Sequence, residues 1–356
     1  MKPRVMSAVL VACLSAVALW AASTPSTSLL VLSKQDHTLA IVDPATLKVV
    51  ATIPAGNDPH EVVASSDGSR AYISNYGFGA YNTISVADLV AQKALPLIDL
   101  GVLRGPHGLA FAGGELYFTA EINKVFGRYN PATQKIDWIL GTGQDRTHMI
   151  EVSKNLDCIY TSNVNSGTIS IIQKAAAPAG TPPPPRRTGN GPGLRGRQGP
   201  PRGPQGWEET VLPTGLGTEG FDVSPDGNEI WAAAARGGTI SIINVAAKKV
   251  VQTLDAHVMG ANRLKFTPDG KYVFVSLLSA SNGDLAIFNA ATRREVKRLS
   301  LGHGAGGILM QPDGARAYVS CSSGNYVAVI SLKTLEVVGR IHAGRGPDGL
   351  AWAVRK

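Results

Sequence analysis

Three histidines begin the same short sequence motif at three places along the chain. His60 and His107 follow a proline, His148 follows a threonine, and an alternating apolar run comes after each of them. Later copies of the motif carry other residues at this position, namely Glu219, Asn262, Gly306 and Asp348. Neutral imidazoles and carboxylates are ligands for zinc and other transition metals, and Glu and Asn oxygens suit a harder cation. If the copies lie side by side, these residue types predict a site that binds a ligand or a divalent metal ion.

The motif recurs seven times at nearly constant spacing. The copies start at residues 59, 106, 147, 218, 261, 305 and 347, and their spacing is 41 to 47 residues except for one interval of 71. The long interval contains the 32 residues of segment 175–206, and without them its length would be 39. A period of about 40–45 residues with several short strands per unit is typical of propeller blades.

Each repeat contains runs typical of four short strands. An Asp-Gly turn, which both residues favour because they tolerate positive φ, precedes runs such as 70–75 and 229–234. The last copy, 347–354, supplies only one strand, and the N-terminal segment 29–53 supplies the three strands that this copy lacks. We therefore expect an all-β, seven-bladed β-propeller that forms a single domain over residues 24–356, with its ring closed by 29–53 joining 347–354.

The repeat also predicts where the histidines lie. In a four-stranded blade, the blade-to-blade connections and the connections between the second and third strands share one face of the disc. All seven histidines fall at such places, and the six candidate ligand residues at the mouth of the channel are His60, His107, His148, Glu219, Asn262 and Asp348. The metal would be held by His60, His107, His148 and Glu219. The alternative is that these side chains only hydrogen-bond to neighbouring loops and channel water.

Other residues are candidates for the same face or the channel wall. Three arginines are available for an anionic ligand, or for pairing with nearby carboxylates: Arg146, Arg263 and Arg345. Three aromatic residues form a lip at the mouth, or pack against an adjacent loop: Tyr76, Phe78 and Tyr81. Glu151 and Asp222 lie within inner strands and are candidate carboxylates of the channel wall, for which the sequence assigns no partner.

The charge distribution argues against a nucleic-acid partner. The formal net charge is +8, but seven basic residues lie among the first four residues and in segment 175–206, so the remainder is nearly neutral. That segment contains nine Pro and eight Gly and cannot form a core, so we expect it to be disordered. Its five arginines either contact an anionic surface or have no function.

The N-terminus has the pattern of an export signal. A basic start is followed by an apolar run from Val5 to Ala22, which predicts a signal peptide over residues 1–23. We expect a periplasmic or secreted monomer without a transmembrane anchor, and no lipoprotein anchor at Cys13, because the apolar run continues well beyond it. Cys158 and Cys321 lie at non-equivalent repeat positions, so we expect two buried residues rather than a disulfide.

The strands after the turns carry a resemblance to a known family. The runs Tyr72-Ile73-Ser74-Asn75, Tyr160-Thr161-Ser162-Asn163 and Tyr318-Val319-Ser320 resemble the signature of YVTN-repeat (YncE-like) propellers. This resemblance covers residues 29–354 apart from the insertion, and it implies a seven-bladed, exported protein that is mostly non-enzymatic in that family. The second repeat resembles a blade of the virginiamycin B lyase group, which implies metal-dependent chemistry with His and Glu.

Two classes of function follow from these patterns. The first is an exported module that binds a small-molecule ligand or a protein partner through its histidine-rich face. The alternative is a metal-dependent hydrolase or lyase, lactonase-like or virginiamycin B lyase-like, with one divalent ion at the channel mouth. A tightly bound ion with open coordination beside a carboxylate or histidine base would distinguish the second class from the first.

Overall fold

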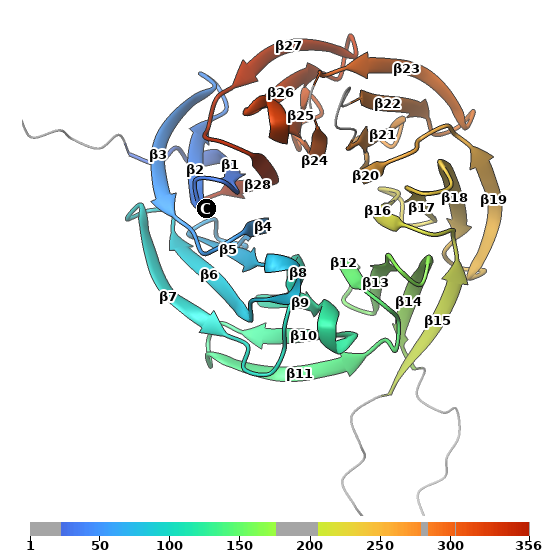
Figure 1. The fold of residues 1–356 in the computed structure, drawn as a ribbon, viewed down its shortest axis with the longest axis horizontal. Helices are drawn as coiled ribbons and strands as arrows, with labels where there is room; N and C mark the ends of the chain where they lie inside the picture. Colours follow the sequence, from blue (N-terminus) through green and yellow to red (C-terminus); the bar gives the residue numbers. More distant parts are fainter. Residues whose placement is uncertain (1–22, 176–205, 279–283, 303, 356) are drawn as a thin grey trace, which may run out of the picture.

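The computed structural model describes residues 23–175, 206–278, 284–302 and 304–355. Their strands form seven four-stranded antiparallel sheets, which are arranged as blades around a central channel (Figure 1). The predicted seven-bladed β-propeller is therefore confirmed. Most of the predicted signal peptide and of segment 175–206 lies outside the described residues, as do Cys13 and His303.

The blades are numbered from the first motif copy, and their strands are given from the channel outward. The first blade consists of β4 (Pro59–Ala64), β5 (Arg70–Asn75), β6 (Thr83–Asp88) and β7 (Lys93–Asp99). The second consists of β8 (Pro106–Ala112), β9 (Glu115–Ala120), β10 (Val125–Asn130) and β11 (Lys135–Gly141). The third consists of β12 (Thr147–Val152), β13 (Cys158–Asn163), β14 (Thr168–Lys174) and β15 (Trp207–Pro213). The fourth blade consists of β16 (Thr218–Val223), β17 (Glu229–Ala234), β18 (Thr239–Asn244) and β19 (Lys249–Asp255). The fifth consists of β20 (Ala261–Phe266), β21 (Tyr272–Leu277), β22 (Asp284–Asn289) and β23 (Arg294–Ser300). The sixth consists of β24 (Ala305–Met310), β25 (Arg316–Cys321), β26 (Tyr326–Ser331) and β27 (Glu336–Ile341).

The seventh blade joins the two ends of the described chain. Its inner strand is β28 (Pro347–Val354), followed outward by β1 (Thr27–Ser33), β2 (Thr38–Asp43) and β3 (Lys48–Pro54). β28 pairs antiparallel with β1, with Leu30 opposite Ala351. Because this pairing joins segments far apart in sequence, the ring has no free terminal blade, as predicted.

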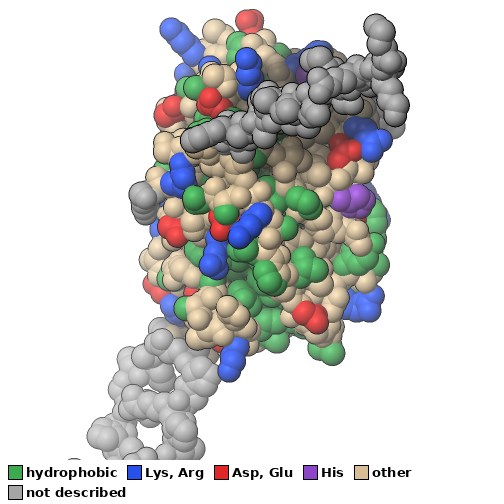
Figure 2. Space-filling view, turned by 90° about the vertical axis from the view of Figure 1, so that its left-hand side faces the viewer, with side chains coloured by type: hydrophobic (Ala, Val, Ile, Leu, Met, Phe, Trp, Pro, Cys, Tyr) green, Lys and Arg blue, Asp and Glu red, His purple; other side chains and the backbone are tan. Residues whose placement is uncertain are grey.

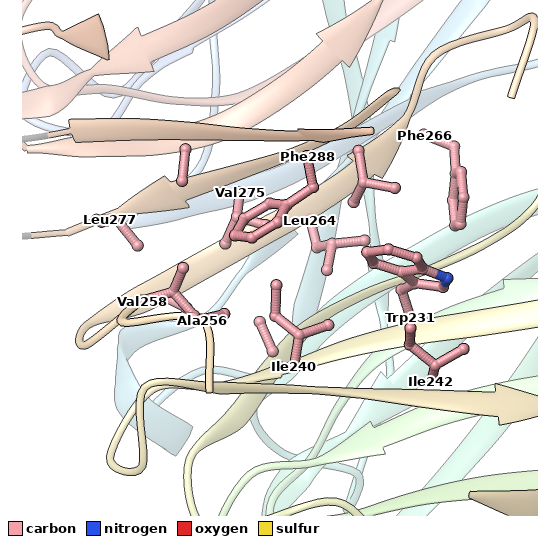
Figure 3. Packing of buried hydrophobic residues seen from close by; sticks show 14 residues of the cluster. Trp231, Ile240, Ile242, Ala256, Val258, Leu264, Phe266, Val275, Leu277 and Phe288 are labelled. Carbon is pink, nitrogen blue, oxygen red and sulfur yellow. The ribbon is translucent and has the colours of Figure 1, made fainter. Parts of the chain in front are cut away.

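Apolar side chains fill the spaces between neighbouring blades. The largest cluster lies between the fourth and fifth blades, where Trp231, Ile240 and Ile242 face Leu264 and Phe288 (Figure 3). Trp231 is fully buried, and its indole N–H donates to the Glu229 carboxylate at 2.9 Å. Alternating strand residues supply these contacts because successive side chains point to opposite faces of a sheet. The packing between blades thereby sets the positions of the inner strands.

The connections have the geometry that the repeat predicts. Gly227 and Gly270 of the Asp-Gly turns have φ values of 77° and 70°, which favour glycine. Short 3₁₀ turns follow the second strands of three blades, at η1 (Gly77–Gly79), η2 (Glu121–Asn123) and η3 (Ser322–Gly324). We use "histidine face" for the flat side that carries these three turns and the blade-to-blade connections.

The outer wall of the ring has no strong charge pattern in the view shown. Basic and acidic side chains are intermixed there, and histidine appears toward one of the flat faces (Figure 2). Among the described residues, none of the helices is long and apolar enough to cross a membrane. Cys158 and Cys321 are unpaired, and Cys321 is buried whereas Cys158 is partly exposed.

Candidate functional site

A register shift at the start of every inner strand shapes the channel mouth. In the first blade, Pro59 lies opposite Asn75 and Val62 opposite Ile73, so the inner strand has one extra residue between the two pairs. Equivalent shifts occur in the other six blades. A bulge of this kind redirects side chains and is common beside functional sites. It allows two consecutive residues of one strand to contribute to the site at the mouth.

Glycines at the bulge let the inner strands approach one another closely. A Cβ atom on Gly349 would overlap the carbonyl oxygen of His60 in the next blade, and one on Gly307 would overlap that of Asp348. Gly108 and Gly220 have the same relation to the third and fifth blades. Because no side chain separates these strands, the residues beside the glycines pack into one layer.

The three predicted histidines lie together in this layer. The ring centroids of His60 and His107 are 5.2 Å apart, and those of His107 and His148 are 3.6 Å apart. Tyr76 packs its ring edge-on against both His60 and His107, with 4.8 Å between centroids in each case. All three imidazoles are buried. They therefore form a packed cluster, not an open ring of side chains around the mouth.

His148 is held between two carboxylates. Its Nδ1 contacts Glu121 Oε1, and its Nε2 lies 3.1 Å from Glu219 Oε1. Burial alone would lower the pKa of His148, but Glu121 and Glu219 outweigh this effect and raise it. Burial also opposes ionisation of Glu219, but His148 and Arg263 hold the pKa of Glu219 well below its usual value. The structure therefore favours a charged imidazolium between two ionised carboxylates.

His107 has the opposite environment. Burial, followed by the adjacent His148 and His60, lowers its pKa well below the usual value, so this imidazole is neutral at pH 7. Its Nδ1 is buried and has no hydrogen-bond partner among the described residues. An unpaired buried polar atom is costly and is uncommon in native proteins.

Arg263 crosses the channel beneath the histidines. Its guanidinium contacts Glu61 Oε1 of the first blade and lies 3.1 Å from Glu219 Oε1 of the fourth, although Arg263 belongs to the fifth. Asn262 also donates to Glu219 Oε1, at 2.8 Å. Arg263 is therefore paired with carboxylates, which was the alternative prediction for this residue. The ion pairs form a layer of charged groups across the channel beneath the histidines.

The seventh blade completes the network. Asp348 lies 3.1 Å from the ammonium group of Lys34, and Lys34 Nζ lies 2.9 Å from His60 Nε2. His60 Nδ1 also lies 3.2 Å from the Asp58 carbonyl oxygen. Burial lowers the pKa of His60, with a smaller effect in the same direction from Lys34. Asp348 thus lies at the predicted position, and its ion pair with Lys34 connects it to His60.

The predicted metal ligands have other partners in this arrangement. Both nitrogens of His148 face carboxylates, and His60 Nε2 faces Lys34. Within the ranges that the structure describes, no group of three or more His, Cys, Asp or Glu side chains is arranged to hold a metal ion. His60, His107, His148 and Glu219 are neighbours; His148 and Glu219 belong to an ion-pair network, whereas His107 is neutral and its Nδ1 has no partner among the described residues.

The remaining candidates divide into buried and exposed residues. Tyr76 is buried and donates from its hydroxyl to Glu121 Oε2 at 2.5 Å, whereas Phe78 is 79% exposed. The ring of Tyr81 lies beside Gly77. Of the three predicted lip residues, Phe78 is therefore the one that is largely exposed. Arg345 pairs with Asp36 at 2.6 Å, which again matches the carboxylate-pairing alternative.

Three of the remaining histidines lie at the rim of the same face. His37 Nδ1 is 3.4 Å from the Gly56 carbonyl oxygen, and His342 Nδ1 is 3.3 Å from that of Asn325. His257 Nδ1 lies 3.4 Å from the exposed Asp255 carboxylate. None of the three has a ring contact or hydrogen bond with the buried cluster, so the described histidines of this face form one cluster and scattered rim residues.

A pocket of about 330 Å³ opens beside the cluster on the same face. Residues of the first three blades line it: Tyr76, Phe78, Glu121, Ile122, Lys124, Asp145, Arg146 and Asn165. Arg146 Nε lies 3.5 Å from Glu121 Oε2, so the wall of this pocket is continuous with the His148 network. Glu121, Glu61 and Lys34 belong to this network but were not predicted from the sequence. Glu121 could have been placed on the histidine face from the sequence, since it follows the second strand of its blade.

Comparison with known proteins supports the fold. Neither protein-family models nor curated protein sequences gave a match. A solved structure of a functionally unknown protein from Desulfotomaculum acetoxidans is similar, with a TM-score of 0.69 and 15% identity over 92% of this chain and 99% of that one. A candidate 6-phosphogluconolactonase from Bacteroides fragilis has the same TM-score and identity, over 93% and 99% of the two chains. Hydrazine synthase of Kuenenia stuttgartiensis has a TM-score of 0.65 and 18% identity over 82% and 89%.

These similarities are too low in identity to carry a function. The seven-bladed fold implied by the resemblance to YVTN-repeat proteins is confirmed, and membership of that family stays a prediction. The same is true of the resemblance of the second repeat to virginiamycin B lyases.

Proposed function

We propose that this protein binds a small organic anion on its histidine face, in the pocket between Phe78 and Arg146. The observation that carries this proposal is the pocket itself, which joins exposed apolar side chains to a guanidinium anchored by a buried ion-pair network. Its volume of about 330 Å³ suits a compact molecule of the size that protein pockets commonly enclose.

The polar wall supports recognition of an anion. Arg146 and Lys124 line the pocket and keep part of their side chains exposed, and Lys124 lies 4.0 Å from the Asp145 carboxylate on the same wall. Glu121 is already engaged, because its oxygens contact Tyr76, His148 and Arg146. A guanidinium can donate two parallel hydrogen bonds to a carboxylate, which gives both affinity and orientation.

The apolar wall supports a ligand with an aromatic or aliphatic body. Phe78 and Ile122 are both exposed and line the same pocket. Phe78 has a φ of 50°, a conformation uncommon for a residue other than glycine. The Gly77 amide, which donates to Asp58 Oδ2 at 2.8 Å, helps to hold this turn. Such local strain is often retained where a side chain must be presented to a ligand.

Binding of benzoate tests this proposal. Benzoate should bind more tightly than benzyl alcohol, and Arg146→Gln should weaken benzoate binding about tenfold or more through loss of a charge-assisted contact. Arg128→Gln is the matched control, because Arg128 pairs with Asp137 outside the pocket. Equal binding of benzoate and benzyl alcohol, or equal effects of the two variants, would contradict the proposal. Calorimetric titration of the wild type and both variants with each ligand measures these differences.

The metal-dependent hydrolase or lyase remains the alternative, with weaker support from the geometry. His148 would have to give up a carboxylate contact to coordinate an ion, and His60 would have to turn from Lys34. Metal analysis of protein purified without chelator, beside a His60/His107/His148 triple-alanine variant, decides this point. About one ion per wild-type chain and none in the variant would favour the metal site. Export, a protein partner and a monomeric state remain predictions.

A further inference from the structure

The channel contains a second cavity, separate from the pocket on the histidine face. It has a volume of about 330 Å³ and is lined by inner-strand residues of all seven blades. Most of its wall is apolar, with Val63, Ala110, Met149, Leu309 and Leu350 among the lining residues. A largely apolar cavity with a few convergent polar groups is the usual form of a small-molecule site.

Arg263 separates this cavity from the histidine cluster. Its guanidinium lines the cavity and reaches Glu61 across the channel. The pair is held further by Glu219, at 3.1 Å from Arg263. Because both ends of this ion pair are largely buried, it closes the channel beneath the mouth. A ligand in the cavity therefore has to enter from the opposite face.

The opposite face provides that route. Glu151 and Val152 line the cavity and also line a neighbouring pocket of about 380 Å³, which is formed with the turns at 153–155 and 224–227. Solvent reaches both charged groups at this end, since the side chains of Glu151 and Lys265 are 25% and 33% exposed. The lower end of the cavity is thus open.

Two carboxyl groups share one ammonium group at the lower end of the cavity. Lys265 Nζ lies 2.6 Å from Glu151 Oε1 and 2.8 Å from Asp222 Oδ1, so one ammonium group serves two carboxylates. Asp222 Oδ2 accepts a further bond from the Phe266 amide at 2.7 Å. In its protonated form, the Glu151 carboxyl also donates a hydrogen bond to the adjacent Asp222. These are the two inner-strand carboxylates to which the sequence alone assigned no partner.

We propose that the channel cavity binds a small organic cation, a primary amine with a compact apolar body, through Glu151. The ammonium group takes the place of the proton on Glu151 and pairs with the ionised carboxylate. The apolar body lies against the channel wall between Ala110 and Leu309. This site is independent of the anion pocket, because the two lie on opposite sides of the Arg263 ion pair.

Proton release accompanies this binding. Burial and then Asp222 outweigh Lys265 and raise the pKa of Glu151 to about 8, so its carboxyl is largely protonated at pH 7. An arriving ammonium favours the ionised carboxylate, and the displaced proton goes to solvent. The reaction is balanced as an ammonium ion and a protonated Glu151 giving the ion pair and one free proton.

Calorimetry with benzylamine tests the site, with benzyl alcohol as its neutral analogue. Benzylamine should bind more tightly than benzyl alcohol, and Glu151→Gln should weaken it about tenfold or more by removing a charge-assisted contact. Titrations at pH 7 in two buffers of different ionisation enthalpy should show net proton release. Glu208→Gln, on the exposed outer strand β15, is the matched control and should leave binding unchanged.

A second variant separates the outcomes. Ala110→Leu fills the cavity without altering its charges and should also weaken benzylamine, whereas Arg146→Gln should not. Equal binding of benzylamine to wild type and Glu151→Gln, or no advantage over benzyl alcohol, would overturn the proposal. If Glu151→Gln does not fold, unchanged benzylamine binding in Ala110→Leu would overturn it. If Arg146→Gln loses benzoate binding but keeps benzylamine binding, the two sites are independent, as proposed.

Discussion

Replacing Arg263 by methionine tests whether the ion pairs across the channel are buried. The substitution keeps a long side chain but removes the guanidinium that contacts Glu61 and Glu219. The Arg263 side chain is 7% exposed, and those of the two glutamates are 15% and 20% exposed. Removing one member of a buried pair typically costs about 3–5 kcal/mol, because the remaining charge is left buried.

The structure places the expected loss near the lower end of that range. Glu219 keeps His148 and Asn262 as partners, whereas Glu61 has no other cation in contact with its carboxylate among the described residues. Most of the cost should therefore come from Glu61. We expect Arg263→Met to lower the free energy of unfolding by about 3 kcal/mol. Adding Glu61→Gln should restore part of it, with a coupling of about 1–2 kcal/mol.

Urea unfolding followed by tryptophan fluorescence measures these differences. Arg128→Met is the control, since Arg128 and Asp137 form a partly exposed pair that should contribute less than about 1 kcal/mol. If Arg263→Met costs no more than Arg128→Met, or if the double variant loses the sum of the two single stability losses, the ion pairs of Arg263 are well hydrated. Arg263 would then not close the channel to water.

Three further changes test the packing around the site. The His148 pKa is raised in the folded state, so its contribution to stability is full below pH about 6.5 and is lost as pH rises through the folded pKa. The stability difference between wild type and His148→Gln should therefore shrink with rising pH, and a constant difference would contradict the ion-pair description. Gly349→Ala should destabilise by about 1–3 kcal/mol because its methyl overlaps the His60 carbonyl, whereas Gly141→Ala, which has open space, should not; equal urea midpoints would refute this. Trp231→Ala should cost about 3–5 kcal/mol in the same assay through the cavity it leaves, and a loss below 1 kcal/mol would show that the core repacks.

The blade architecture follows directly from local sequence patterns. The strands predicted at 70–75 and 229–234 are β5 and β17 without change of boundary. Strand closure between 29–53 and 347–354 followed from counting the strands in each repeat, and β1 is only two residues longer than predicted. Period-two alternation and turn residues act over a few positions, so the chain reveals them without knowledge of distant contacts.

The chemistry of the site depends on contacts that no local pattern records. The repeat placed His60, His107 and His148 in one layer, but it did not show that Glu121 would occupy one nitrogen of His148. Glu121 comes from a connection in the neighbouring blade, and only the packing of the second blade against the third brings the two together. That His60, His107, His148 and Glu219 hold a metal ion stays a prediction.

The sequence by itself determined the number of blades, their strands, the closure of the ring and the face that carries the histidines. Tertiary structure alone decided that the inner strands bulge at the mouth, that Arg263 reaches Glu61 from the fifth blade to the first, and that Lys265 serves both Glu151 and Asp222. The physical reason is distance along the chain. Strand formation depends on neighbours in sequence, whereas the pairing and burial of charges depend on residues that only the closed ring brings together.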